Sequence, residues 1–97
     1  MARFELARAA LADFDAITDY TIERWGKMQS ATYLDALEAL LADLARRPLI
    51  GRKRGDLAPG LFSFPFESHV VFYTRAPSGI AVARILHQRQ DAQRHLR

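Results

Sequence analysis

Residues 68–87 read SHVVFYTRAPSGIAVARILH, and they determine the kind of sheet that the chain can form. Two runs rich in β-branched and apolar residues flank the turn-forming sequence APSG, which predicts antiparallel strands over about residues 68–75 and 79–87. The preceding residues 61–66 (LFSFPF) predict a third strand and hence an antiparallel meander. Because Pro65 cannot donate a ladder hydrogen bond, we expect that third strand to lie at a sheet edge or to be interrupted there.

Upstream of the strands, the apolar residues recur at helical spacing. One amphipathic helix is predicted from about residue 9 to residue 25, and a second from about residue 27 to residue 47. The apolar stripe of the second is the stronger and comprises Leu34, Leu37, Leu41 and Leu44. Gly26 suits the left-handed turn between the helices, and Pro48 ends the second one. Two helices joined by one or two residues predict an antiparallel helical hairpin.

The remaining segments complete the predicted order of elements. Arg3-Phe4-Glu5-Leu6 alternates polar and apolar residues, as a short half-buried strand does. Residues 48–60 contain two prolines, three glycines and no periodicity, which predicts an exposed loop. The last ten residues are polar, and Leu96 is the only large apolar side chain among them. The predicted order is β-α-α-β-β-β, an α+β fold with the helical hairpin packed on one face of a small antiparallel sheet. At 97 residues we expect one domain, residues 1–97.

Composition excludes several classes of protein. A hydrophobic fraction of 49% with 26% charged residues is typical of a folded domain and excludes wholesale disorder. The absence of cysteine excludes disulfides and Cys-ligated metal sites, and three widely spaced histidines make another protein-held metal improbable. We therefore expect no cofactor and no metal. No apolar run reaches membrane-spanning length and the N-terminus lacks a signal sequence, so we expect a cytoplasmic protein without membrane contact.

Charge is divided unequally along the chain. Residues 1–45 carry four basic and eight acidic side chains, a net charge of −4, whereas residues 46–97 carry ten basic and three acidic ones, a net charge of +7. Twelve of the fourteen basic residues are arginines, which favours planar, hydrogen-bonded recognition of anions. The second half is therefore expected to present a positive surface to an acidic protein, to nucleic acid or to both.

Two histidines are the first candidates for chemistry, since imidazole is the usual acid–base group near neutral pH. His69 opens one predicted strand and His87 closes the next, so the hairpin would bring them together. The alternative, which we favour, is that both bond to backbone at the strand ends. Asp13, Asp15 and Asp19 are expected to lie on a solvated helix face and not to form an acid–base pair.

Arg84 is unusual because it interrupts the apolar run IAVARIL. A guanidinium there needs an internal carboxylate, such as Glu67 or Asp91, or a place in a groove, since an unpaired buried charge is costly. The pattern leaves both possibilities open. Phe62, Phe64 and Phe66 share one face of the proline-interrupted strand, which suggests a surface completed by a partner.

Taken together, these signatures resemble the ParE toxins, a branch of the RelE/ParE superfamily. The resemblance rests on Arg24-Trp25-Gly26, on Gly51-Arg52, on SHVVFY at residues 68–73 and on RILHQRQD at residues 84–91, and it spans residues 4–96. It implies the fold described above. It also implies a toxin of a type II toxin–antitoxin system that is not itself an enzyme and that poisons DNA gyrase. A ParD-like antitoxin is implied as the partner in a hetero-oligomeric complex, with operator DNA bound only through the antitoxin.

Two surfaces are expected to serve this function. The positive loop and the phenylalanine strand fit an acidic antitoxin segment that folds on binding, and the residues assigned to that contact are Arg52, Arg54, Phe62, Phe64 and Arg84. The end of the chain matches the C-terminal signature of the family, and the residues assigned to toxicity are His87, Arg89, Arg94, His95 and Leu96. No residue is assigned a catalytic role.

The resemblance also supplies an alternative, a RelE-like ribosome-dependent mRNA endoribonuclease. Those enzymes carry an arginine three residues before the tyrosine that aligns with Tyr73, and here that position is Val70. Their C-terminal catalytic tyrosine has no counterpart either, since residues 92–97 contain no tyrosine. Valine cannot stabilise a phosphate or an oxyanion, so gyrase poisoning is the preferred reading. A plain nucleic-acid-binding module is disfavoured because most of the aromatic residues are expected in the core.

Overall fold

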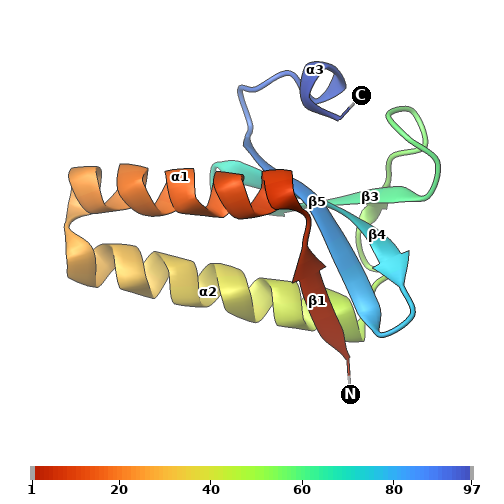
Figure 1. Ribbon diagram of the computed structural model, residues 1–97, viewed down its shortest axis with the longest axis horizontal. Coiled ribbons are helices and arrows are strands. Elements are labelled where there is room, and N and C mark those ends of the chain that lie inside the picture. Colours follow the sequence, from red (N-terminus) through yellow and green to blue (C-terminus); the bar gives the residue numbers. More distant parts are fainter. Residues whose placement is uncertain (1, 97) are drawn as a thin grey trace.

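The computed structural model describes residues 2–96. It consists of a helical hairpin packed against a five-stranded sheet, with a short helix at the C-terminal end (Figure 1). The elements are β1 (Arg3–Leu6), α1 (Arg8–Trp25), α2 (Lys27–Arg46), β2 (Arg52–Lys53), β3 (Leu61–Phe66), β4 (His69–Ala76), β5 (Gly79–His87) and α3 (Ala92–His95). The predicted order β-α-α-β-β-β is confirmed, and β2 and α3 are additions to it.

A single residue connects the two long helices. Gly26 has φ +86°, a conformation that disfavours side chains, and its N–H donates to the carbonyl of Ile22 at 2.8 Å. Beneath the turn, the hydroxyls of Thr21 and Ser30 form a buried hydrogen bond of 2.7 Å. The hairpin is therefore closed by backbone geometry and by a polar contact between facing helices, and its turn projects beyond the sheet (Figure 1).

The sheet is mixed, which corrects the expectation of an antiparallel one. Its strand order is β1-β5-β4-β3-β2, and β1 runs parallel to β5, with Arg3 opposite Gly79 and Leu6 opposite Val82. The reason is that the helical hairpin returns the chain to its starting side, so the first strand enters beside the last with the same direction. All other pairs are antiparallel.

The second addition, β2, lies inside the segment that was expected to be only a loop. It pairs with Phe62 and Ser63 of β3 and extends no further. Pro65 therefore lies on the part of β3 whose outer edge no described strand covers, as expected for a residue that lacks an N–H.

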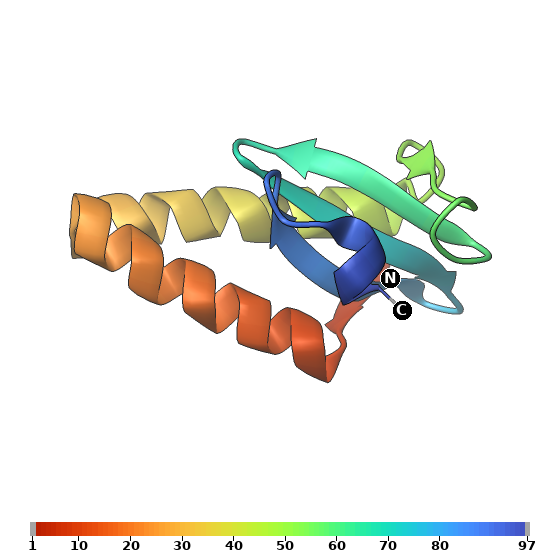
Figure 2. The same ribbon diagram turned by 90° about the horizontal axis from the view of Figure 1, so that it is seen from above.

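Two apolar clusters cover the two faces of the sheet. The helix-facing cluster is the larger, and Leu37, Leu41 and Leu44 of α2 are fully buried in it. On the opposite face, Leu61, Phe72 and Leu86 are covered by the loop around Leu57 and by Leu96 at the chain end. The end of the chain is thus not simply a polar tail, because it folds as α3 against the sheet (Figure 2).

The three phenylalanines of β3 face the helices. Phe62 is 7% exposed and its ring stacks on that of Tyr73, with a centroid distance of 5.5 Å. Phe64 and Phe66 pack against the same cluster and are partly exposed. The expectation of an open phenylalanine face is therefore wrong for Phe62, because this residue is buried in the helix-facing cluster and against Tyr73.

Leu41 provides a test of this packing. Leu41→Ala removes a fully buried side chain and is expected to lower the free energy of unfolding by about 2–5 kcal/mol. Leu49→Ala is the matched control, since Leu49 is 62% exposed and should change stability by less than about 0.5 kcal/mol. Urea unfolding followed by circular dichroism measures both, and equal midpoints for the two variants would contradict the assigned core.

Candidate functional site

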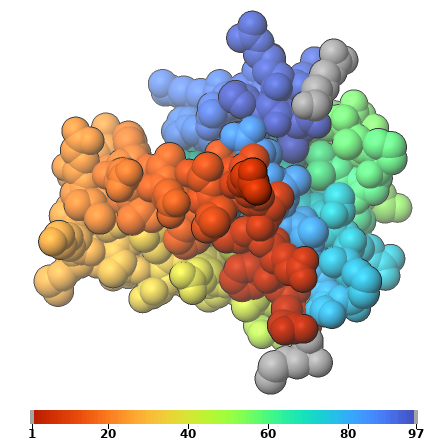
Figure 3. All heavy atoms as spheres, viewed as in Figure 1, coloured from red at the N-terminus to blue at the C-terminus, as the bar shows by residue number. Residues whose placement is uncertain are grey.

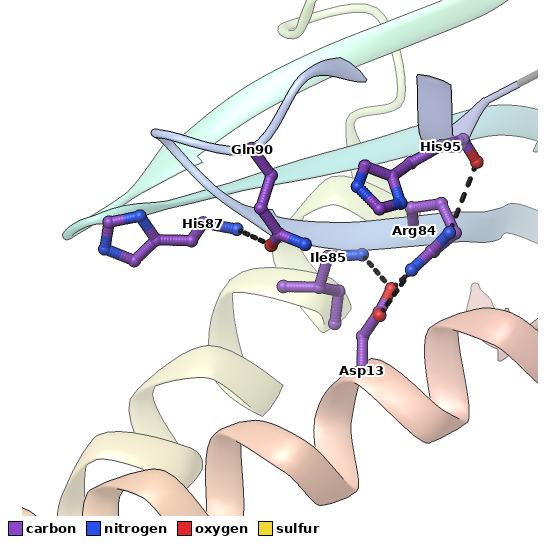
Figure 4. Close-up of polar contacts among 6 residues, drawn as sticks. All are labelled: Asp13, Arg84, Ile85, His87, Gln90 and His95. Atoms are coloured by element: carbon purple, nitrogen blue, oxygen red, sulfur yellow. Dashed lines mark hydrogen bonds and ion pairs between the residues drawn. The ribbon is translucent and has the colours of Figure 1, made fainter. Parts of the chain in front are cut away.

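An ion pair between Asp13 of α1 and Arg84 of β5 lies at the centre of the candidate site (Figure 4). Arg84 Nε and Nη2 donate to the two carboxylate oxygens of Asp13, each at 2.7 Å. The side chains are only 20% and 14% exposed, and the hydrogen bond to Asp13 raises the pKa of Arg84 above its ordinary value. Two expectations are corrected here: the partner of Arg84 is neither Glu67 nor Asp91, and Asp13 does not lie on a solvated face.

Asp13 also accepts a backbone hydrogen bond at the uncovered edge of β5. β1 ends at Leu6, opposite Val82, so no described strand covers the outer edge of β5 beyond that point. There the N–H of Ile85 donates to Asp13 Oδ2 at 2.9 Å. The helical spacing of Ala10, Asp13 and Ile17 places Asp13 on the inward stripe of α1, and this was the signal that could have revealed it.

A β-bulge changes which face of the sheet the side chains in this part of β5 occupy. Phe72 pairs with Arg84 but Tyr73 pairs with Val82, so Ala83 is skipped in the register. The extra residue changes the alternation, and Val82 and Ile85 consequently both pack in the helix-facing cluster. Such irregularities cannot be read from an alternating pattern alone.

The residues assigned to toxicity lie between the last residue of β5, His87, and the end of the described chain. Arg84 Nη1 donates to the carbonyl of His95 at 3.2 Å, which ties the end of α3 to the ion pair. The Asp91 carboxylate caps α3 by accepting from the N–H of Gln93 at 3.0 Å, and Leu96 packs on the sheet. Arg89, Arg94 and His95 are exposed, so this segment carries basic groups at the surface. Figure 3 shows the C-terminal segment next to α1.

The two histidines at the strand ends lie together, as predicted. His69 pairs with His87 across β4 and β5, and their rings meet edge to face with centroids 5.4 Å apart. His87 Nδ1 accepts from the N–H of Arg89 at 3.1 Å, which is the expected backbone contact. His69 departs from that expectation, because its Nδ1 bonds to the hydroxyl of Tyr33 at 3.1 Å. Both histidines line a cavity of about 400 Å³ between α1 and the strand ends.

The residues assigned to the antitoxin contact do not form one patch. Arg52 is exposed on β2, whereas Arg54 forms two hydrogen bonds of 3.1 Å to Asp56 and lies 5.8 Å from the ring centre of Phe72. Phe64 is half-buried at the helix-facing side of the sheet, and Phe62 is in the core. Arg84 lies on β5, separated from β2 by two strands. Only Arg52 of the five has a largely free side chain.

Tyr73, the tyrosine of the SHVVFY signature, is fully buried. Its hydroxyl donates to the carbonyl of Pro48 at 2.9 Å and accepts from the N–H of Gly51 at 3.0 Å, and burial raises its pKa. A Cβ at Gly51 would lie 2.2 Å from this hydroxyl, so glycine is required there. Tyr73 therefore anchors the loop that follows α2.

Neither a metal-ligand cluster nor a membrane-spanning helix is found among the described residues. Within residues 2–96, no cluster of three or more histidine, cysteine or acidic side chains is placed to hold a metal ion. None of the described helices combines the length and apolar character needed to cross a membrane.

His69 should make stability depend on pH. Burial, followed by the charge of His87, lowers the pKa of His69 below 6.5, so the unfolded chain binds this proton more readily than the folded one. The free energy of unfolding should therefore fall as the pH drops through about 6.5, down to the folded-state pKa. His69→Gln should flatten that slope in urea unfolding between pH 7 and 5, whereas His95→Gln, at an exposed site, should not. Parallel slopes for the two variants would refute this origin.

Comparison with known proteins gives a consistent result. Residues 4–92 match the family model described as the ParE toxin of the type II toxin–antitoxin system parDE. The chain is 39% identical over 95 residues to Toxin ParE1 of Mycobacterium tuberculosis strain H37Rv, covering 97% of each protein. It is 38% identical over 96 residues to Toxin ParE1 of Caulobacter vibrioides, covering 99% of each.

A solved structure shares the fold. It is described as the chromosomal ParDE toxin–antitoxin system from P. aeruginosa, and it superposes with a TM-score of 0.74 at 21% sequence identity. The match covers 90% of this chain and 96% of that one. With the family match spanning nearly all of the sequence, we conclude that this chain belongs to the ParE toxin family of type II toxin–antitoxin systems.

Proposed function

We propose that this chain is the toxin of a type II pair, that a ParD-like antitoxin neutralises it, and that it acts by poisoning DNA gyrase. The observation that carries the proposal is the family match over residues 4–92, which includes both sequence signatures. In this proposal the toxin is one domain over residues 1–97 and acts in the cytoplasm. It reaches operator DNA only through the antitoxin.

Positive charge supports the choice of an acidic partner. Residues 46–97 carry a net charge of +7, and Arg52, Lys53, Arg89 and Arg94 are all exposed. An antitoxin segment that is disordered when free would gain long-range attraction from these groups and apolar contacts once bound.

The two signature positions support a non-enzymatic poison over a ribonuclease. Val70, at the position of the ribonuclease arginine, packs against the apolar cluster of Leu61, Phe72 and Leu86. The hydroxyl of Tyr73 is engaged by Pro48 and Gly51, so it is not available to transfer a proton to RNA. Neither residue can stabilise a developing charge on phosphate.

A poison needs no catalytic group. Gyrase passes through an intermediate in which its DNA is cleaved, and a ligand that binds this state more tightly than the others increases its population. A folded, basic segment such as residues 87–96 is suited to that role. Its position is held by the ion pair through the carbonyl of His95.

The target is tested with purified toxin freed of antitoxin. It should inhibit supercoiling by gyrase of its host and increase the amount of cleaved DNA, while ribosome-bound mRNA stays intact. Arg89→Glu should weaken this effect about tenfold or more, because it reverses an exposed charge in the C-terminal segment. Arg75→Glu is the control, since Arg75 is also exposed but lies at the end of β4 that is far from His87 and the C-terminal segment. Site-specific mRNA cleavage with unaffected gyrase would assign the chain to the ribonuclease branch.

The partner surface is tested by association kinetics with the antitoxin. Arg52→Glu combined with Arg54→Glu should slow association about tenfold at low salt and reduce its salt dependence, because both changes remove steering charge. Arg8→Glu combined with Arg24→Glu, both exposed on α1, is the control with the same change in net charge. Stopped-flow rates that respond to neither salt nor the double substitution would exclude this placement.

A further inference from the structure

The cavity between α1 and the ends of β4 and β5 has no role in the function proposed so far. Its volume is about 400 Å³. Ile17 and Ile85 form apolar parts of its wall, and polar groups come from Asp13, Tyr20, His69, His87 and Gln90. An apolar recess with a few convergent polar groups is the usual form of a binding site.

Hydrogen bonds around the rim determine which polar atoms remain free. His87 Nδ1 accepts from the N–H of Arg89, so the neutral imidazole carries its proton on Nε2. Gln90 Oε1 accepts from the N–H of His87 at 2.7 Å (Figure 4), which leaves the amide NH₂ of Gln90 as a donor. In both side chains the acceptor atom is therefore already hydrogen-bonded, and the N–H donors remain free.

His69 contributes in the same way. Its Nδ1 is bonded to the Tyr33 hydroxyl, and we assign that hydroxyl as the donor, which places the imidazole proton on Nε2. Nε2 has no hydrogen-bond partner among the described residues. Every fully buried side-chain nitrogen or oxygen in residues 2–96 does have such a partner, so Nε2 is not fully buried. His69 Nε2 is therefore reached from the open space of the cavity.

The Asp13 carboxylate does not accept hydrogen bonds from these donors, because both of its oxygens are already engaged. One of its oxygens accepts from Arg84 Nη2, the other accepts from Arg84 Nε and from the N–H of Ile85, and Arg84 balances its charge. The polar lining thus presents free donors beside a carboxylate that is already satisfied. A ligand that fits must bring acceptor oxygens on a short apolar stem.

We propose that this cavity is a carboxylate-binding site, and that it receives an aspartate or glutamate side chain of the antitoxin. The assignment to the antitoxin rests on the proposed function. A carboxylate suits the neutral imidazole and amide donors, and its methylene stem suits Ile17 and Ile85. The exposed Arg89 on the same turn adds attraction for an acidic segment. Inorganic phosphate is less suitable, because it has no apolar stem to pack against Ile17 and Ile85.

Free toxin labelled on histidine tests the site by NMR titration at pH 7 and constant ionic strength. Propionate should shift the ring signals of His69 and His87 to saturation, while His95, which lies outside the cavity, should not move. Propionamide has the same shape without the charge and should bind at least tenfold more weakly. Equal movement of all three histidines, or tighter binding of inorganic phosphate than of propionate, would overturn the proposal.

Gln90→Glu is the diagnostic substitution. Its carboxylate can still accept from the N–H of His87, but it removes the NH₂ donors and adds a repelling charge, so propionate binding should fall at least tenfold. Gln88→Glu places the same charge on the same turn outside the cavity and should retain binding. Equal loss in the two variants would reduce the effect to general electrostatics and refute the site.

A second experiment measures the affinity of the toxin variants for the antitoxin. Gln90→Glu should raise the Kd of the antitoxin at least tenfold, mainly through faster dissociation, and Gln88→Glu should change it less than threefold. An unchanged Kd for Gln90→Glu, with propionate binding lost, would reject the antitoxin as the occupant. Failure of the antitoxin to bind the unmodified toxin would instead refute the proposed function, while the propionate titration would still decide whether the carboxylate site exists.

Discussion

The bond between Asp13 and Arg84 connects three parts of the molecule that are otherwise held by apolar packing. It joins α1 to β5, closes the uncovered strand edge at Ile85, and holds the carbonyl of His95. Because both side chains are mostly buried, removing either one would leave its partner charged and poorly solvated, which costs several kcal/mol. The ion pair therefore fixes the C-terminal segment relative to α1, together with the packing of Leu96 on the sheet, and Asp13 forms a wall of the cavity that His69 and His87 line.

Most of the fold could be predicted because its signals are local. The stripe from Leu34 to Leu44, the turn at Gly26 and the paired runs of residues 68–87 each specify their own element. The parallel pairing of β1 with β5 could not be predicted, because it depends on where the helical hairpin returns the chain. The partner of Arg84 was missed for a related reason: 71 residues separate it from Asp13, and periodicity places a side chain on a face without naming its neighbour.

The candidate site was predictable to a lesser degree. The meeting of His69 and His87 followed from strand register, since a hairpin brings its two ends together. The free donors of the cavity could not be predicted from strand register. They depend on the hydrogen bonds that Arg89, Tyr33 and His87 form with the cavity side chains. Phe62 shows the opposite error: its strand was expected to offer an open apolar face, but Phe62 is buried in the helix-facing cluster. Sequence pattern thus located the segments, and side-chain partners decided which atoms remain free to bind.

The adjacency of the first and last strands has a consequence for synthesis of the protein. The helical hairpin involves only neighbouring residues and can form early on a nascent chain. β1 must wait, since its partners are residues 79–82 of β5, and closing so long a loop carries an entropic cost before any strand contact is gained. The ion pair and the C-terminal segment form later still, because Arg84 and His95 follow those residues in the chain. A ribosome making this protein can therefore let the basic segment reach its ordered form only after residues 84–95 have been released from it.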